Sequence, residues 1–337
     1  MKRNLLFVIP AVLLLLFCRQ NQASVGMFVY REDDLFMRSL TGSIQRKAEN
    51  RLPLETYYSL NSQIIQNEQI ESQLKSGASL MIINPVDRIG AHAVVRKLEA
   101  VDVPVIFFNR EPLESDLRLW DKTWYVGARA EQSGRMQAEL VMDLFGSDPG
   151  ELNEFDRNGD GRIQTVILKG EQGHQDAEIR TETVLTAFQE NGYSIDLLST
   201  EIANWNRDEG FEKMKDLLDT ITVPIELVLS NNDAMAIGAI SIMRQKGMFK
   251  DTNGNGLIDK GDLQWIPVVG IDGVPEAVVQ IKEGYLYGTV LNDSESMAEA
   301  IVELALEILS GGVGSDFPYP VTDGKYIWID YKTFILE

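Results

Sequence analysis

The sequence has 337 residues, and its 31 Lys and Arg residues against 51 Asp and Glu residues leave a formal net charge of −20. The length corresponds to about two domains of ordinary size, and a charged content of 24% is typical of a folded protein. The negative charge, with no basic run, excludes nucleic acid as a partner, while one cysteine excludes an internal disulfide and two histidines leave little for a zinc site.

An export signal is predicted at the N-terminus. A short basic start precedes an almost unbroken apolar run from Asn4 to Phe17, which is too short to cross a hydrocarbon core of ~30 Å. Cys18 follows this run directly and resembles the acylated cysteine of a bacterial lipoprotein signal; an ordinary cleaved signal with an incidental thiol is the alternative. We therefore expect residues 1–17 to be a signal peptide and residues 18–24 a lipidated tether, in a periplasmic protein that meets the membrane only through its lipid.

Short β-branched or aromatic runs alternate with helical patterns along the rest of the chain. The first expected strand–helix pairs are Val25–Tyr30 with Asp34–Asn50, Leu54–Leu60 with Gln63–Lys75, and Leu80–Asn84 with Val86–Ala100, before strands at Val105–Asn109 and Trp124–Val126. After a helix at Met136–Phe145, strands are expected at Thr165–Lys169, Ile195–Ser199, Leu227–Ser230, Val268–Ile271, Gly288–Leu291 and Tyr326–Asp330. The helices among them are expected at Glu178–Glu190, Gly210–Leu218, Ala234–Gln245, Pro275–Lys282 and Ser296–Leu309.

This alternation predicts an α/β fold of two doubly wound parallel-sheet lobes, because strands that alternate with helices form parallel sheets covered on both faces. No glycine-rich phosphate loop follows any expected strand, so a nucleotide site is not indicated. Ligands of open α/β sheets bind at the carboxyl ends of the strands, and functional residues are therefore expected there.

The residues just past the expected strands are carboxylates, amides, cations and aromatics. They include Asp34, Phe36, Asn109, Arg110, Glu111, His174, Asp176, Arg180, Trp205, Asn231, Asn232, Asp233, Asp272, Asn292 and Asp293. Such polar groups suit sugar hydroxyls, and aromatic rings suit the C–H faces of a sugar. Individually they have plainer interpretations: Asp176 and Arg180 are spaced as a helical i,i+4 pair, and Asn232 precedes an apolar helix as an N-cap would. Their shared position at strand ends favours a sugar site.

Two acidic loops are predicted to bind calcium. The first offers oxygen at calcium-loop positions 1, 3, 5, 7 and 9 through Asp156, Asn158, Asp160, the carbonyl of Arg162, and Gln164. Its twelfth position is Ile167, which cannot ligate, and Glu226 is the candidate for the missing carboxylate.

The second loop is complete within itself. Its oxygen donors are Asp251, Asn253, Asn255, the carbonyl of Leu257, Asp259 and Asp262. An Asn/Gly-rich surface turn is the alternative, because Asn replaces two carboxylates. Both calcium sites are expected to be structural, since cages of oxygen with no open position beside a nucleophile do not indicate metal-assisted catalysis.

Several long segments carry specific motifs: Val25–Phe36, Ile83–Asp87, Phe107–Pro112, Lys169–Arg180, Asn231–Met235, Gly270–Ala277 and Thr289–Asp293. Through them the chain resembles the periplasmic glucose/galactose-binding proteins, the sugar receptors of bacterial ABC transporters. The resemblance implies that D-glucose or D-galactose is bound by Asp34, Asn109, His174, Asp176, Arg180, Asn232, Asp272 and Asn292. It also implies that Phe36 and Trp205 stack on the two faces of the pyranose.

The resemblance further implies the periplasmic binding protein type I architecture, in which a three-segment hinge joins the lobes. The crossings are expected near Val126-Gly127, Leu291-Asn292 and Asp323-Gly324. The N-terminal lobe is then residues 25–126 plus 293–323, and the C-terminal lobe residues 127–292 plus 324–337. A sugar held from both lobes favours closure, and the closed form of a monomer is expected to dock on an ABC transporter permease.

The expected function is thus capture and delivery of a hexose without chemical change. A chemoreceptor is an alternative partner for the closed form. A glycoside hydrolase would pair carboxylates such as Asp34 and Asp272, and this reading is the weaker one. Sugar-responsive repressors of the same fold need a helix-turn-helix at the position that the export signal occupies.

Overall fold

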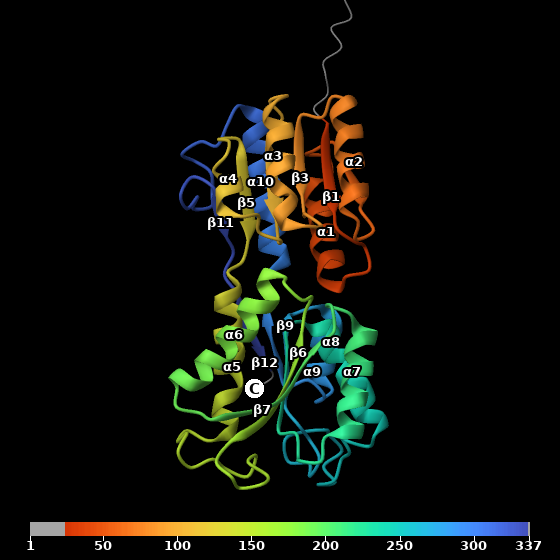
Figure 1. The fold of residues 1–337 in the computed structure, drawn as a ribbon, viewed down its shortest axis with the longest axis vertical. Coiled ribbons are helices and arrows are strands. Elements are labelled where there is room, and N and C mark those ends of the chain that lie inside the picture. Colours follow the sequence, from red (N-terminus) through yellow and green to blue (C-terminus); the bar gives the residue numbers. More distant parts are fainter. Residues whose placement is uncertain (1–23, 336–337) are drawn as a thin grey trace, which may run out of the picture.

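The polypeptide forms two α/β lobes stacked along the long axis of the molecule (Figure 1). The computed structural model describes residues 24–335, so the predicted signal peptide and Cys18 lie outside the described part. Each lobe is built on one six-stranded sheet. This arrangement confirms the predicted pair of doubly wound lobes. No helix within residues 24–335 combines the length and the apolar composition needed to cross a membrane.

The strands of the N-terminal lobe are all parallel, in the order β11-β5-β4-β3-β1-β2. They are β1 (Val25–Val29), β2 (Leu54–Tyr58), β3 (Leu80–Ile83), β4 (Val105–Phe108), β5 (Thr123–Gly127) and β11 (Tyr326–Trp328). Strands β1, β3 and β4 are buried along their whole length, as a parallel sheet covered on both faces requires. The helices of this lobe are α1 (Leu35–Ala48), α2 (Gln63–Lys75), α3 (Ala91–Glu99), α4 (Glu114–Leu117) and α10 (Ser294–Ser310).

The sheet of the C-terminal lobe has the order β12-β10-β9-β8-β6-β7, and only β12 runs antiparallel to its neighbour. Its strands are β6 (Ile163–Lys169), β7 (Ile195–Ile202), β8 (Leu227–Ser230), β9 (Val268–Asp272), β10 (Gly288–Leu291) and β12 (Lys332–Ile335). The helices are α5 (Ala130–Met142), α6 (Gln175–Glu190), α7 (Arg207–Thr220), α8 (Asp233–Gln245) and α9 (Pro275–Lys282). Helix α8 is buried over most of its surface, which explains its nearly continuous apolar sequence.

The chain passes between the lobes after β5, after β10 and after β11. The first two crossings lie where the sequence predicts them, but the third does not. Strand β11 pairs with β5 in the register Tyr326 with Tyr125, and the Lys325 ammonium donates to the Trp120 carbonyl at 2.6 Å. Residues 324–328 therefore belong to the N-terminal lobe and not, as predicted, to the C-terminal one. The crossing follows Trp328 and leads into β12, which the sequence analysis did not predict.

Several helices begin at the boundary between the lobes, directly after a strand. Asp34 caps α1, His174 caps α6 and Asn232 caps α8, each by accepting a hydrogen bond from a backbone amide of the first turn. Capping side chains are polar by necessity, because they satisfy amides that the helix leaves without partners. The fold thus places polar residues of both lobes at one shared boundary.

Candidate functional site

A cavity lies between the lobes, and the space free of atoms in it and its opening to solvent is about 360 Å³. Its walls are formed by Tyr30, Asp34, Phe36, Met37, Asn109 and Arg110 of the N-terminal lobe and by His174, Asp176, Arg180, Trp205, Asn232 and Asp272 of the C-terminal lobe. The cavity therefore brings together every predicted sugar-binding residue except Asn292. Tyr30 and Met37 were missed by the strand-end analysis, and Arg110, which that analysis included, is absent from the set that the resemblance implies.

The Asp34 carboxylate is fixed from two directions. Oδ1 accepts from the Met37 amide at 2.9 Å, and Oδ2 accepts from the Tyr30 hydroxyl at 2.5 Å. The side chain is nevertheless on the cavity wall, and each carboxylate oxygen has a second lone pair. Capping the helix and facing the cavity are thus compatible tasks for the same group.

Asn109 directly follows β4 and has a positive φ of 60°, a conformation that Asn tolerates better than most residues. Its carbonyl accepts from the Tyr125 hydroxyl at 2.8 Å, and its Oδ1 accepts from Asn84 Nδ2 at 3.3 Å. Asn84 is fully buried, and it also donates to the Phe108 carbonyl at 3.1 Å. A buried polar scaffold therefore orients the Asn109 amide.

Two contacts join the lobes across the mouth of the cavity. The Arg110 guanidinium lies 3.9 Å from the centre of the Tyr30 ring and donates to Glu171 of the other lobe at 3.3 Å. The next residue, Glu111, accepts from Gln175 Nε2 of the other lobe at 3.1 Å. These contacts describe a conformation in which the lobes are closed upon one another.

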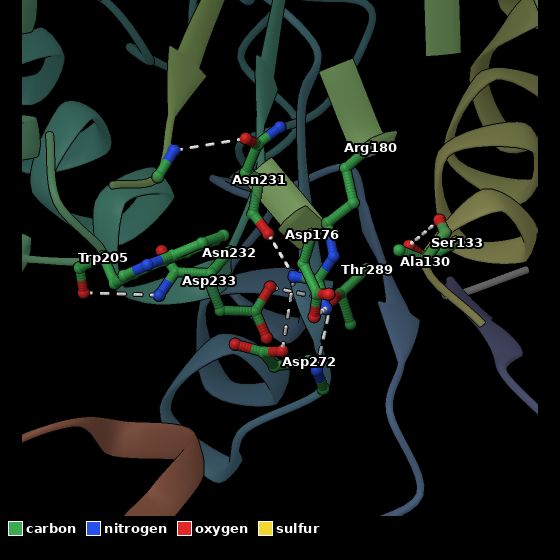
Figure 2. A network of polar contacts seen from close by, with 12 residues as sticks. Ala130, Ser133, Asp176, Arg180, Trp205, Asn231, Asn232, Asp233, Asp272 and Thr289 are labelled. Atoms are coloured by element: carbon green, nitrogen blue, oxygen red, sulfur yellow. Dashed lines mark hydrogen bonds and ion pairs between the residues drawn. The ribbon is translucent and has the colours of Figure 1, made fainter. Parts of the chain in front are cut away.

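Arg180 is the centre of the polar network in the C-terminal lobe (Figure 2). Its Nη1 donates to the Asn231 carbonyl at 2.6 Å and lies 4.0 Å from Asp272, while its Nη2 lies 3.7 Å from Asp176. Nη2 also donates at 3.0 Å to the hydroxyl of Tyr331, on the third crossing segment. One buried guanidinium thus positions two cavity carboxylates and touches the hinge.

Carboxylates outnumber cations in this network. Burial raises the pKa of Asp272 and of Asp176, and the nearby Arg180 opposes the rise in both. Burial also raises the pKa of Asp233 to about 7, against the hydrogen bonds that this carboxylate accepts from Thr289 Oγ1 at 2.7 Å and the Val274 amide at 3.0 Å. The cavity wall therefore has more hydrogen-bond acceptors than donors. This suits a ligand with many hydroxyl groups, because each hydroxyl group can donate a hydrogen bond.

His174 and Trp205 form one corner of the cavity. The two rings meet edge to face with centres 5.2 Å apart, and a Cβ atom at Gly170 would clash with the indole. Burial and three neighbouring guanidinium groups lower the pKa of His174, so its imidazole is neutral at pH 7. Nδ1 accepts from the Asp176 amide at 3.2 Å, which leaves the proton on Nε2 as a donor.

Four polar atoms at or beside the cavity are buried without a hydrogen-bond partner in the described part of the chain. They are Nε of Arg180, Nε1 of Trp205, Oδ1 of Asn292 and Oε1 of Gln175. Asn292 does not line the cavity, although it is predicted to bind sugar. Its backbone amide donates to the Asp272 carbonyl at 3.1 Å, and the side chain is buried at the second crossing rather than on the wall.

The sequence matches a family model described as "Periplasmic binding protein domain" over residues 25–312. The chain is a periplasmic binding protein. The family confirms the prediction that this protein binds a solute rather than catalysing a reaction.

Relatives cover most of this binding protein. The D-galactose/methyl-galactoside binding periplasmic protein MglB of Haemophilus influenzae is 32% identical over 85% of this chain and 82% of its own length. The ribose import binding protein RbsB of Bacillus subtilis is 24% identical over 87% of this chain and 83% of its own length. A solved ABC transporter solute binding protein from Bacillus halodurans, with bound myo-inositol, superposes with a TM-score of 0.74 at 25% identity, covering 93% of this chain and 94% of that one.

The two predicted calcium loops of the binding protein share one hydrogen-bond pattern. Asp156 accepts from the amides of the glycines three and five residues later, both at 2.8 Å. Asp251 accepts from the corresponding glycine amides at 2.6 and 2.9 Å. In each loop the third residue accepts from the fifth at 3.0 Å, so the two turns have the same shape.

The structure brings Glu226 to the first loop, as predicted. Its carboxylate accepts from the Arg157 amide at 2.5 Å and the Gln164 amide at 3.1 Å, and the residue is 1% exposed. Burial raises the pKa of Glu226, and these backbone hydrogen bonds oppose the rise. Within residues 24–335 no three acidic, cysteine or histidine side chains converge as a metal cage, so amide and carbonyl oxygens would have to complete either site.

Proposed function

We propose that this binding protein captures a hexose, D-glucose or D-galactose, between its lobes and delivers it unchanged to an ABC transporter permease. The observation that carries the proposal is the cavity wall, which combines carboxylates and amides from both lobes with two aromatic rings. The relative from Haemophilus influenzae, whose name includes D-galactose, supports a hexose.

Each part of a hexose would meet a matching group on this wall. The carboxylates of Asp34, Asp176 and Asp272 would accept from hydroxyl groups, and such bonds to a charged acceptor are about twice as strong as neutral ones. Arg180, Asn232 and neutral His174 would donate to hydroxyl or ring oxygens.

The aromatic side chains would bind the apolar part of the sugar. Phe36 is 6% exposed and Trp205 is 8% exposed, and both line the cavity from different lobes. A pyranose ring between them would bury its C–H groups against two π faces. Nε1 of Trp205, which has no hydrogen-bond partner within residues 24–335, would supply one further donor for a hydroxyl group.

Closure of the lobes is the step by which a permease would distinguish the ligand-bound protein from the free protein. A hexose that bonds to both lobes stabilises the closed state by its differential affinity for that state. The contacts of Arg110 with Glu171 and of Glu111 with Gln175 exist only when the lobes meet, and they add to the same preference. The closed outline is what a permease would recognise.

Calorimetric titration with glucose, galactose, ribose, xylose and myo-inositol tests the proposal. We expect one of the two hexoses to bind with 1:1 stoichiometry and more tightly than either pentose or the cyclitol. Preference for a pentose or for myo-inositol would overturn the proposed ligand, and hydrolysis of an aryl glycoside would overturn the transport role.

We also propose that both acidic loops bind Ca²⁺. Support comes from their donor sets, which consist of carboxylate, amide and carbonyl oxygens, the ligands that Ca²⁺ prefers. In the first loop Glu226 would replace the missing twelfth-position ligand, and in the second Asp262 occupies that position. The bound ions would stabilise the C-terminal lobe without taking part in sugar binding.

We further propose that Cys18 carries lipid and tethers the protein within the periplasm. The support is the position of this cysteine directly after the apolar N-terminal run. Mass spectrometry of the mature protein would detect a diacylglyceryl group on an N-terminal cysteine, and a mature N-terminus at any other residue would contradict the anchor.

A further inference from the structure

A second hollow adjoins the sugar cavity at the boundary between the lobes. The space free of atoms in this hollow and its opening to solvent is about 820 Å³, against about 360 Å³ for the cavity, and we call the hollow the outer chamber. Arg110, His174 and Asp176 line both spaces, so the two are joined at these side chains. One hexose in the inner cavity would leave the outer chamber free.

Polar side chains from both lobes line the outer chamber. They include Asp87, Arg88 and Glu111 of the N-terminal lobe and Glu171, Gln172 and Gln175 of the C-terminal lobe. Arg88 Nε is fixed by donating to the Glu111 carbonyl at 2.7 Å. Hydrogen-bond donors and acceptors thus both line the outer chamber, and a hydroxyl group can bond to both kinds.

One of these side chains has a bonding capacity that the protein does not use. Oε1 of Gln175 is buried and has no hydrogen-bond partner among residues 24–335, although Nε2 of the same amide donates to Glu111 at 3.1 Å. A buried acceptor without a donor destabilises a structure unless a ligand or water supplies the missing bond. A hydroxyl group that extends from the inner cavity would supply it.

The charge of the outer chamber indicates which chemical groups of a ligand it disfavours. Its lining carries the carboxylates of Asp87, Glu111, Glu171 and Asp176 against the guanidinium groups of Arg88 and Arg110. The excess of negative charge disfavours a phosphate or carboxylate group on the ligand. An apolar group would leave the Gln175 acceptor without a partner.

We propose that the outer chamber is a subsite for an uncharged, hydroxylated group linked to the first sugar, so that the protein binds hexosides carrying a second hexose. The inference rests on the proposed function, because the first ring must occupy the inner cavity. The second ring lies in the outer chamber against Glu111 and Gln175, and both lobes still close around the ligand.

Titration of the full-length protein with galactose, methyl β-D-galactoside, lactose, melibiose and galactose 6-phosphate tests the subsite. We expect lactose or melibiose to bind about ten-fold more tightly than the methyl glycoside, since one added hydrogen bond to a charged group accounts for such a factor. The phosphate should not bind. If glucose or galactose binds while neither disaccharide binds more tightly than the methyl glycoside, the subsite is refuted and the proposed function stands; if neither glucose nor galactose binds, both are refuted.

Substitution of Gln172 locates the second ring. Gln172 is exposed and lines only the outer chamber, so Gln172→Trp should fold normally, fill the chamber and weaken disaccharide binding about ten-fold with galactose affinity changed less than about two-fold. Gln172→Ala is the matched control and should leave both affinities unchanged.

A second variant removes the charge of Glu111 and keeps its bulk. Glu111→Gln keeps an acceptor for Gln175 but loses the charged oxygen, so it should weaken disaccharide binding about five-fold more than it weakens galactose binding. Glu114→Gln, an exposed carboxylate of the same lobe, is its control. Disaccharide binding that is unaltered in both Gln172→Trp and Glu111→Gln would show that the second ring lies elsewhere and would overturn the inference.

Discussion

Asp34 shows how one side chain serves the fold and the site together. It satisfies the first turn of α1 and is held by the Tyr30 hydroxyl, yet its carboxylate faces the cavity. The helix cap and a bond to a sugar hydroxyl are both compatible with this geometry. The same holds for Asn232, which caps α8 and lines the cavity.

Replacing Asp34 should separate these two tasks. Asp34→Ala is expected to lose about 1 kcal/mol of stability with the cap and to weaken hexose binding by at least about ten-fold with the charged acceptor. Ser62→Ala removes the cap of α2 in the same lobe and should lower stability without changing affinity. Thermal unfolding and calorimetry measure both effects. Equal hexose affinity in Asp34→Ala and the wild type would remove Asp34 from the proposed site.

The buried Asp233 predicts a dependence of stability on pH. Its pKa is about 7 in the folded protein and near the ordinary value of an aspartate when unfolded, so the folded state binds more protons between about pH 4 and 7. Stability from this group is therefore greatest at low pH and falls as the pH rises through that window. In Asp233→Asn the decrease of unfolding free energy from pH 5 to 7.5 should be smaller, whereas the exposed Asp102→Asn should retain it. A steeper decrease in Asp233→Asn would contradict the assignment.

At the scale of elements, the acidic loops and the cavity lie at opposite ends of the same strands. The first loop leads into β6, Glu226 directly precedes β8, and the second loop leads toward β9. The cavity residues follow the carboxyl ends of these strands, whereas the loops lie at the amino ends, at the lower pole of the C-terminal lobe in Figure 1.

Calcium removal should therefore lower stability but not sugar affinity. We expect chelation to reduce the melting temperature by several degrees, as loss of roughly 1–3 kcal/mol would in a domain of this size, with hexose binding at 25 °C nearly unchanged. Glu226→Gln should weaken calcium binding at the first loop only, and Asp262→Asn at the second only. A melting temperature that chelation does not alter would refute the structural role of both loops.

The elements that the sequence predicts best are those with strong local signals. Strands β3, β4 and β8 are short buried apolar runs, and their positions agree with the prediction to within a residue. Strand β12 was not predicted because it is a mostly exposed edge strand of Lys332–Ile335 whose pairing with β10 depends on tertiary contact. The third crossing was misplaced for a related reason: the edge-to-face contacts of Tyr326 and Trp328 with Tyr125 and the contacts of Lys325 with residues 120–123 are long-range.

The candidate site was predicted more completely than the fold because its residues share one positional rule, the strand end. Tyr30 was missed although it follows β1, because an aromatic residue at the end of an apolar run resembles core. Asn292 satisfies the positional rule, yet it is buried at a crossing segment. The packing of the hinge decides whether the residue after a strand lines the cavity or is buried beside it, and this packing cannot be deduced from the strand-end rule.

At the scale of the whole molecule, the ion pair between Arg110 and Glu171 joins the lobes directly. Glu171→Gln should speed hexose release up to about five-fold, since a partly exposed pair contributes up to about 1 kcal/mol to the closed state. Release from the wild type should also quicken with salt, and this effect should be smaller in the variant. Glu190→Gln, which breaks the pair with Arg135 within the C-terminal lobe, is the matched control.

Stopped-flow measurement of tryptophan fluorescence on mixing with hexose yields both rate constants for these variants. Release rates that are the same in Glu171→Gln and Glu190→Gln would show that the cross-cleft pair does not hold the lobes together.

The crossing segments also govern when the chain can fold. The N-terminal lobe needs α10 and β11, and the C-terminal lobe needs β12, so neither sheet is complete before the last part of the chain has been synthesised. The hydrogen bond from Lys325 to Trp120 spans 205 residues, and contacts so distant in sequence make folding slow. Slow folding leaves a nascent chain unfolded for longer, and an unfolded chain is the form that a secretion channel for unfolded proteins can admit.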